Sequence, residues 1–205
     1  MPRTIAALAL VPLLAALPAA ARADALDVPC GATAVQLAAE VAPKLEGRWA
    51  VEHNAGYVVT AGMVMPHPAS NTVDFGRFEL QDGKLVLIPE SDPSRAVTFD
   101  WVTDERWNFD SDASLPEGAR VSGVTGPLPS LAITDEDVSL LSDCPSDDLP
   151  RLVGRDTVTI DGVTMTFTLR LLMIGPDVLY GFQQVDANAA GMPVMERRTF
   201  VMSRA

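Results

Sequence analysis

Cysteine and histidine are both scarce in this chain. Its 205 residues include two cysteines and two histidines, and the sequence has neither a Cys-x-x-Cys pair nor a Gly-x-Ser-x-Gly motif. A dithiol redox centre and a serine nucleophile on a strained turn therefore have no support. No residue stands out as catalytic and no cofactor is expected, so the sequence favours a binding protein over an enzyme.

Positive charge is also in short supply. There are 15 Lys and Arg residues against 27 Asp and Glu residues, which gives a formal net charge of −12. Such a surface repels phosphate backbones and anionic lipids. Nucleic acids and membrane surfaces are therefore not expected as partners.

Long apolar runs are absent, apart from an amino-terminal stretch that has the layout of a signal peptide. Arg3 gives a positive start, residues 5–17 are mostly apolar, and residues 21–23 (Ala-Arg-Ala) form a small-x-small cleavage site. The apolar run is shorter than the ~20 residues that a membrane-spanning helix needs. We expect residues 1–23 to be removed, leaving residues 24–205 as one periplasmic or secreted domain with no membrane insertion.

The two cysteines, Cys30 and Cys144, are most simply a disulfide in an exported chain. The bond would fasten residues 110–150, an acidic and proline-punctuated stretch, to a short helix predicted over residues 32–41. One helical turn is predicted inside that stretch, at 135–141.

Alternation of apolar and polar residues dominates the rest of the chain. It is clearest over residues 163–171, where apolar residues occupy every odd position and Thr or Arg every even one. Successive side chains of a strand point to opposite faces, so this pattern indicates a strand with one buried side. Asp161-Gly162 directly before it favours a tight hairpin turn, because that turn requires positive φ. Further strands are predicted at 45–53, 57–65, 72–80, 84–88, 96–102, 106–109, 157–160, 178–185 and 194–202.

These eight to ten strands predict an all-β fold, because most of them are joined as hairpins between neighbours in the sequence. A turn is predicted at 54–56, between the first two strands. Closing the sheet would remove exposed strand edges. We therefore expect an antiparallel up-and-down β-barrel with a short amino-terminal helix and a disulfide-pinned loop.

The start of the first strand, Gly47-Arg48-Trp49, resembles the Gly-x-Trp motif of lipocalins and of the lipocalin-like domains of bacterial envelope proteins. In those calycin-type barrels the Trp plugs the closed end, and an Arg of the last strand packs across it. Arg197 and Arg198 are the candidates here. Arg198 matches better, because it shares a predicted face with Phe200 and Met202. The resemblance implies a lipocalin-like barrel from about residue 45 to residue 202.

The interior of the predicted barrel is the first candidate site. Small barrels either fill with side chains or hold one small ligand, and the composition here permits both. The candidate ligand-binding residues are Trp49, His53, Tyr57, Phe167, Phe182 and Arg198. The leading hypothesis is an exported protein that binds a small apolar or amphipathic molecule without transforming it. The alternative is a structural or interaction protein of the envelope with a filled barrel, whose unidentified partner would be recognised through residues 110–150.

The second candidate site is Met63-Val64-Met65-Pro66-His67. In an extended chain Met63, Met65 and His67 project to one face, and thioether and imidazole ligands suit Cu(I). The alternative interpretation is that the two methionines fill gaps in the core. With a turn at 54–56, His53 would lie roughly 26 Å from Met65 at about 3.3 Å per residue, so it is left out of the set. A periplasmic copper-binding protein is therefore a further hypothesis.

Overall fold

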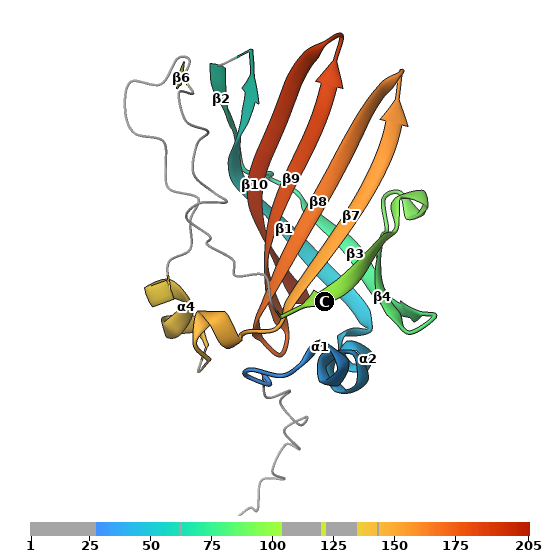
Figure 1. Cartoon of the computed structure of the whole chain (residues 1–205), viewed down its shortest axis with the longest axis vertical. Helices are drawn as coiled ribbons and strands as arrows, with labels where there is room; N and C mark the ends of the chain where they lie inside the picture. The colour runs from blue at the N-terminus through green and yellow to red at the C-terminus, as the bar shows by residue number, and fades with distance from the viewer. Residues whose placement is uncertain (1–27, 62, 104–119, 122–134, 143) are drawn as a thin grey trace, which may run out of the picture.

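The computed structural model describes residues 28–61, 63–103, 120–121, 135–142 and 144–205, which are coloured in Figure 1. The predicted signal peptide, the strand expected at 106–109 and most of the acidic stretch lie outside these ranges. Among the described residues, no helix is both long enough and apolar enough to cross a membrane.

Eight antiparallel strands close into a barrel, which confirms the predicted fold class (Figure 1). Around the ring they follow the order β10-β9-β8-β7-β5-β4-β3-β1, and pairing of β10 with β1 closes it. The strands are β1 (Gly47–Thr60), β3 (Val73–Gln81), β4 (Lys84–Pro89), β5 (Val97–Val102), β7 (Arg151–Ile160), β8 (Val163–Gly175), β9 (Val178–Ala189) and β10 (Met192–Arg204).

The strands differ in length, so the ring is complete at one end only. β5 pairs with β7 through residues 151–154, and β3 pairs with β1 through residues 47–52. Beyond these points the long strands β7–β10 continue as a curved open sheet, which Figure 1 shows rising above the short strands. β1 continues with them and pairs with β2 (Met63–His67), whose other edge pairs with β6 (Arg120–Val121).

The turn predicted at 54–56 is not present. β1 runs unbroken from Gly47 to Thr60, and its register with β10 shifts between His53 and Gly56, which marks a β-bulge. The chain reverses instead at Ala61, whose φ is 50°. Gly56 is required at the bulge, because a Cβ there would clash with the carbonyl group of Arg197 and the side chain of Arg198.

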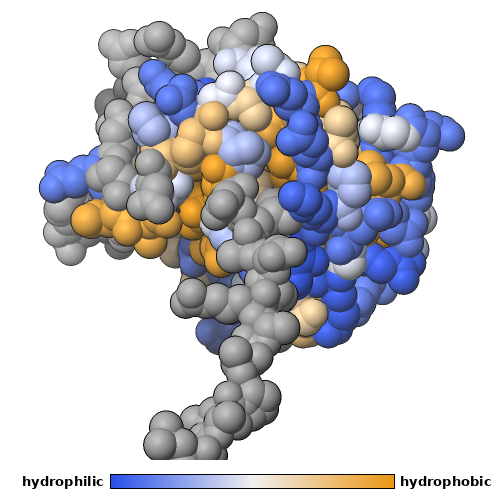
Figure 2. All heavy atoms as spheres, turned by 90° about the horizontal axis from the view of Figure 1, so that it is seen from below, coloured by the Kyte–Doolittle hydropathy of each residue, from blue (hydrophilic) through white to orange (hydrophobic). Residues whose placement is uncertain are grey.

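A short helical segment covers the closed end of the barrel. It consists of α1 (Ala34–Gln36), a π-helical segment (Leu37–Val41) and α2 (Ala42–Leu45). The predicted helix ended before Pro43, but the observed one continues to Leu45. The wider π segment, in which the Ala42 N–H donates to the Leu37 carbonyl, precedes the proline, which has no N–H of its own to donate. In the view from below (Figure 2), hydrophobic residues gather toward the middle of this end and hydrophilic residues lie along one side.

Trp49 lies at the centre of the barrel floor and is fully buried. Its indole N–H donates to the Leu45 carbonyl at 2.9 Å, and its ring meets Phe78 edge-on at 5.9 Å. The Arg204 guanidinium lies over the indole, 4.8 Å from the ring centre, and donates to the carbonyls of Lys44 and Glu46. The last-strand arginine over the tryptophan is therefore Arg204, and the expectation of Arg197 or Arg198 was wrong. β10 runs past the predicted end at residue 202, and its register places Arg204 opposite Trp49.

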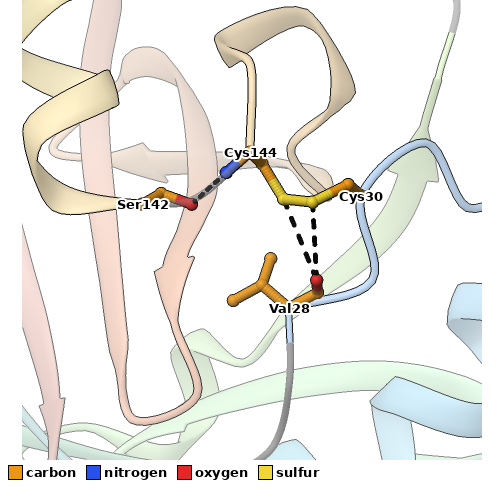
Figure 3. Close-up of a disulfide and its surroundings, with 4 residues drawn as sticks. All are labelled: Val28, Cys30, Ser142 and Cys144. Carbon is orange, nitrogen blue, oxygen red and sulfur yellow. Dashed lines mark hydrogen bonds between the residues drawn. A yellow bond between two sulfur atoms is a disulfide. The ribbon is translucent and has the colours of Figure 1, made fainter.

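The disulfide between Cys30 and Cys144 is confirmed (Figure 3). The carbonyl oxygen of Val28 lies within 3.8 Å of both sulfur atoms, and the Cys144 N–H donates to Ser142 Oγ at 3.2 Å. The predicted helical turn is present as α4 (Asp135–Leu141). Next to it, a second apolar cluster covers the outer side of the barrel with Val138, Cys144, Leu149, Val153, Leu172 and Tyr180.

Removing the disulfide will destabilise the fold. The bond joins residues 114 positions apart, and constraint of an unfolded loop of that length corresponds to about 4–5 kcal/mol in the chain-entropy model. We expect a Cys30→Ser/Cys144→Ser variant to lose a free energy of unfolding of that order in urea titrations. Wild-type protein kept in a reductant should unfold at the same urea concentration as the variant. Equal midpoints for the oxidised protein and the variant would contradict this account.

Replacing Arg204 will weaken the barrel floor. Arg204→Met removes a cation over the indole and two charge-assisted hydrogen bonds to carbonyl groups, and we expect a loss of roughly 2 kcal/mol in the free energy of unfolding. Arg77→Met is the matched control, because its side chain is 58% exposed and pairs only at the surface with Glu79. Urea unfolding of both variants checks the difference, and equal losses would refute the special role of Arg204.

Candidate functional site

A cavity of about 300 Å³ lies inside the barrel, above the buried floor. A second hollow of about 150 Å³ shares part of its lining, including His53, Leu169 and Gln183. The core residues around Trp49 fill the lower part of the barrel, so both hollows belong to the upper part, where the short strands end. The barrel is filled at one end and hollow toward the other.

The apolar wall of the cavity follows from strand alternation. Phe167 and Leu169 lie on the same face of β8 as the core residue Leu171, so they continue the inner wall upward. Val97 of β5 and Pro89 at the end of β4 face them from the short strands. This wall can take apolar parts of a ligand.

Polar groups enter the cavity from three directions. Arg198 of β10 and Gln183 of β9 lie on the inner face, and Asp156 of β7 lies opposite Phe167. Arg95, from the 3-10 turn η2 (Pro93–Arg95), places its guanidinium 4.4 Å from the centre of the Phe167 ring. The cavity thus combines an apolar wall with two cations and at least one carboxylate.

His53 lies on the inner face of β1, with 13% of its side chain exposed. Its Nε2 is 3.3 Å from Asp74 Oδ2, and its ring centre is 5.7 Å from that of Phe200. Burial lowers the pKa of His53, the nearby Arg198 guanidinium lowers it further, and the Asp74 carboxylate opposes both effects. His53 is therefore neutral at pH 7.

Two buried nitrogen atoms in the cavity lining have hydrogen-bonding capacity that the described residues leave unused. They are His53 Nδ1 and Arg198 Nε. Arg198 Nε is 3.5 Å from Glu196 Oε1, which is an ion-pair distance without hydrogen-bond geometry. Because buried polar groups are normally satisfied, these two atoms are exceptions among the buried polar groups of the described residues.

The six candidate ligand-binding residues occupy three different places. His53, Phe167 and Arg198 line the cavity. Trp49 lies in the floor beneath it. Tyr57 and Phe182 are buried on the outer face of the sheet, opposite Arg197 and Thr199, and so do not face the cavity.

The positions of Tyr57 and Phe182 on the outer face have identifiable physical causes. Tyr57 was expected on the face of Trp49 and His53, but the bulge between His53 and Gly56 moves it to the opposite face. Phe182 pairs with Arg170, so it shares a face with the even-numbered residues of β8 rather than with Phe167.

Several cavity residues escaped the sequence reasoning, among them Asp156, Gln183 and Arg95. Asp156 could have been found, because a two-residue turn at Asp161-Gly162 places it opposite Phe167. Alternation along β9 assigns Gln183 to the inner face. Its pairing with Leu169 of β8, however, depends on the irregular register near Gly175. Arg95 comes from a short 3-10 turn and has no periodic signal.

Met63, Met65 and His67 share the inner face of β2. His67 pairs with Gly56, which pairs with the cavity residue Arg198, and register partners project to the same face. His53 was left out of this set because a turn at 54–56 would have placed it far from Met65. That reason was wrong, because the chain turns at Ala61 and β2 runs back along β1. His53 nevertheless contacts Asp74. In the described part of the chain, no group of three or more His, Cys, Asp or Glu residues could hold a metal ion.

The stability of the fold will depend on the protonation of His53. Its pKa is lowered in the folded state, so the unfolded chain takes up this proton more readily. The free energy of unfolding therefore falls as the pH drops from about 6.5, the ordinary His value, toward the lower folded pKa. His53→Asn should remove this component. Urea unfolding at pH 7.5 and 5.0 checks it, and an unchanged pH dependence in the variant would contradict it.

No protein-family model matches this chain, and no curated protein matches it in sequence. Its function is therefore inferred from the barrel, the cavity and the residues around them.

Proposed function

We propose that this chain is an exported protein that binds one small amphipathic molecule in the open half of its barrel. The observation that carries the proposal is the cavity of about 300 Å³, with Phe167 and Leu169 on one side and Arg198 and His53 on another. That volume is at the lower end of the range for small-molecule sites, about 300–1,000 Å³. Eight-stranded barrels are wide enough to hold one such ligand.

An amphipathic ligand fits the lining better than a wholly apolar one. A wholly apolar molecule would cover the charged side chains of Arg198 and Arg95 in the cavity lining without giving them a polar partner, and burying an unpaired charge is costly. A ligand with a polar or anionic group at one end would contact Arg198 and Arg95, and its apolar part would lie along Phe167 and Leu169.

Two features outside the cavity support this assignment. The Trp49–Arg204 pair at the closed end strengthens the resemblance to lipocalins that begins at Gly47-Arg48-Trp49. The Cys30–Cys144 disulfide fits an oxidising compartment, as does the signal peptide predicted over residues 1–23. A lipocalin-like carrier in the periplasm or outside the cell is the function that these features favour together.

Native mass spectrometry of protein purified gently from its own export compartment tests the proposal. We expect a discrete organic mass that is lost on denaturation, or that is acquired from a hydrophobic extract. A bare polypeptide mass with the disulfide intact, and no uptake from the extract, would overturn the proposal. That result would favour the alternative function, an interaction protein that recognises its partner through residues 110–150.

Blocking the cavity should abolish binding of an amphipathic probe. Leu169→Trp adds bulk inside the cavity, and we expect it to weaken binding of the fluorescent probe anilinonaphthalene sulfonate at least tenfold. Thr168→Trp places the same side chain on the opposite face of β8 and is the matched control. Circular dichroism and thermal melting confirm that both variants fold. Equal probe affinity in the two folded variants would show that the probe binds elsewhere.

A further inference from the structure

The inner face of the open sheet above the cavity is apolar, yet it is not packed against a core. The alternation of β7, β8 and β9 places hydrocarbon side chains on this face, and each of them is partly or largely exposed: Val158, Ile160, Val163, Met165 and Ala187. Ile160 alone is 49% exposed. The outer face of β7 and β8 at the same level is lined mainly by threonine. Because contiguous exposed apolar surface commonly marks a binding site, the inner face calls for a ligand.

These side chains form an apolar track along β8 that begins in the cavity. Phe167 and Leu169 line the cavity, and Met165 and Val163 follow on the same face toward the start of the strand. Leu169 and Val163 are six residues apart, which corresponds to roughly 20 Å at about 3.3 Å per residue. A compact ligand held in the cavity would therefore leave the upper part of the track uncovered.

The positive charges of the site lie at the lower end of this track. Arg198 pairs with Gln183, which pairs with Leu169, so these three residues share one level of the sheet. The Arg95 guanidinium is 4.4 Å from the centre of the Phe167 ring. Above Phe167, the described side chains on the inner face of β7, β8 and β9 carry no charge.

The carboxylates of the cavity lining are engaged within their own segments. Asp156 Oδ1 accepts from the Thr157 N–H at 2.8 Å, and Asp92 Oδ1 accepts from the Ser94 N–H at 3.2 Å. Glu196, next to the cavity, is 3.5 Å from Arg198 Nε without hydrogen-bond geometry. An anionic ligand group would thus meet two guanidinium groups and carboxylates that already have local donors or lie to one side.

We propose that the ligand is a long-chain carboxylate bound with its head inward. Its carboxylate contacts Arg198 and Arg95 in the cavity, and its unbranched hydrocarbon tail lies along the β8 track toward the open end. The opposite orientation would place the carboxylate among uncharged side chains and the tail over two guanidinium groups, which is unfavourable for both. This inference rests on the proposed carrier function and adds the class of the ligand and its orientation.

A chain-length series tests the track. We expect the affinity of the disulfide-bonded protein, measured by calorimetric titration below the micelle concentration, to rise from hexanoate through octanoate and dodecanoate to hexadecanoate. A fully buried methylene corresponds to about a fourfold change in Kd, and cover on one side only to about twofold. Hexadecanoate should therefore bind at least thirtyfold more tightly than octanoate. An affinity that stops rising at octanoate would overturn the track and leave the carrier proposal standing, whereas failure of the carrier proposal would appear as no bound organic molecule in native mass spectrometry.

A pair of matched variants shows whether the tail uses this face of β8. Val163→Gln/Met165→Gln makes the track polar without changing the net charge, and we expect at least a fivefold loss of affinity for hexadecanoate and less than a twofold loss for octanoate. Thr164→Gln/Thr166→Gln is the control, because these residues lie between the others on the outer face. Circular dichroism confirms that both variants fold. Equal losses in the two variants, or an equal loss for both acids, would contradict the proposal.

Stearates with a nitroxide on carbon 5 or carbon 16 report the orientation. In protein with ¹³C-labelled methyl groups, the carbon-5 label should broaden the Leu169 signals most and the carbon-16 label those of Val163. Leu179, which is fully buried in the core, should be affected by neither. The reverse order would overturn head-inward binding.

Replacing Arg198 tests the contact with the head group. In Arg198→Gln, the preference of the wild-type protein for hexadecanoate over the uncharged hexadecanamide should shrink at least fivefold, because the variant lacks the guanidinium charge. The same titrations measure it. An unchanged preference would show that the carboxylate binds elsewhere.

Discussion

The seam between β1 and β10, where Arg204 lies over Trp49, is the contact on which the rest of the structure depends. It closes the sheet, and its register fixes which residues of the two strands face inward. Arg204 also bonds to the carbonyls of Lys44 and Glu46, which ties the helical segment to the same seam. One cation therefore joins the first strand, the last strand and the cover of the closed end. The positions of His53 and Arg198 above the floor follow from this registration.

The unequal strand lengths explain how one barrel contains both a core and a cavity. Where β3, β4 and β5 complete the ring, aromatic and branched side chains fill the interior around Trp49, Phe78 and Phe99. Above residue 154, β7 is no longer paired with β5, and Phe167 lines the cavity there beside the guanidinium of Arg95. The barrel is therefore filled at its closed end and hollow toward its open end.

Local patterns in the sequence predicted the elements well, because alternation and turn chemistry act over a few residues. The hairpin at Asp161-Gly162 has the positive φ values that the dipeptide predicts, and β8 has the expected inner face. The turn predicted at Asn54-Ala55-Gly56 was wrong, because turns and bulges favour the same residue types. Only the pairing of both edges of β1 shows that these residues form a bulge. That decision moves Tyr57 to the outer face. The positions of residues that depend on long-range register, such as Phe182 and Arg204, could not be predicted locally for the same reason.

Glu196 lies where polar side chains of β2 and β10 meet on the inner face of the sheet. Its Oε1 is 3.1 Å from His67 Nδ1 and 3.5 Å from Arg198 Nε. Both nitrogen atoms are buried, and neither has a hydrogen-bond partner in the described part of the chain, so the carboxylate is within ion-pair distance of both without the geometry of a hydrogen bond. The bulge brings Gly56 between His67 and Arg198, and the missing side chain at that position is what lets these groups gather around one carboxylate.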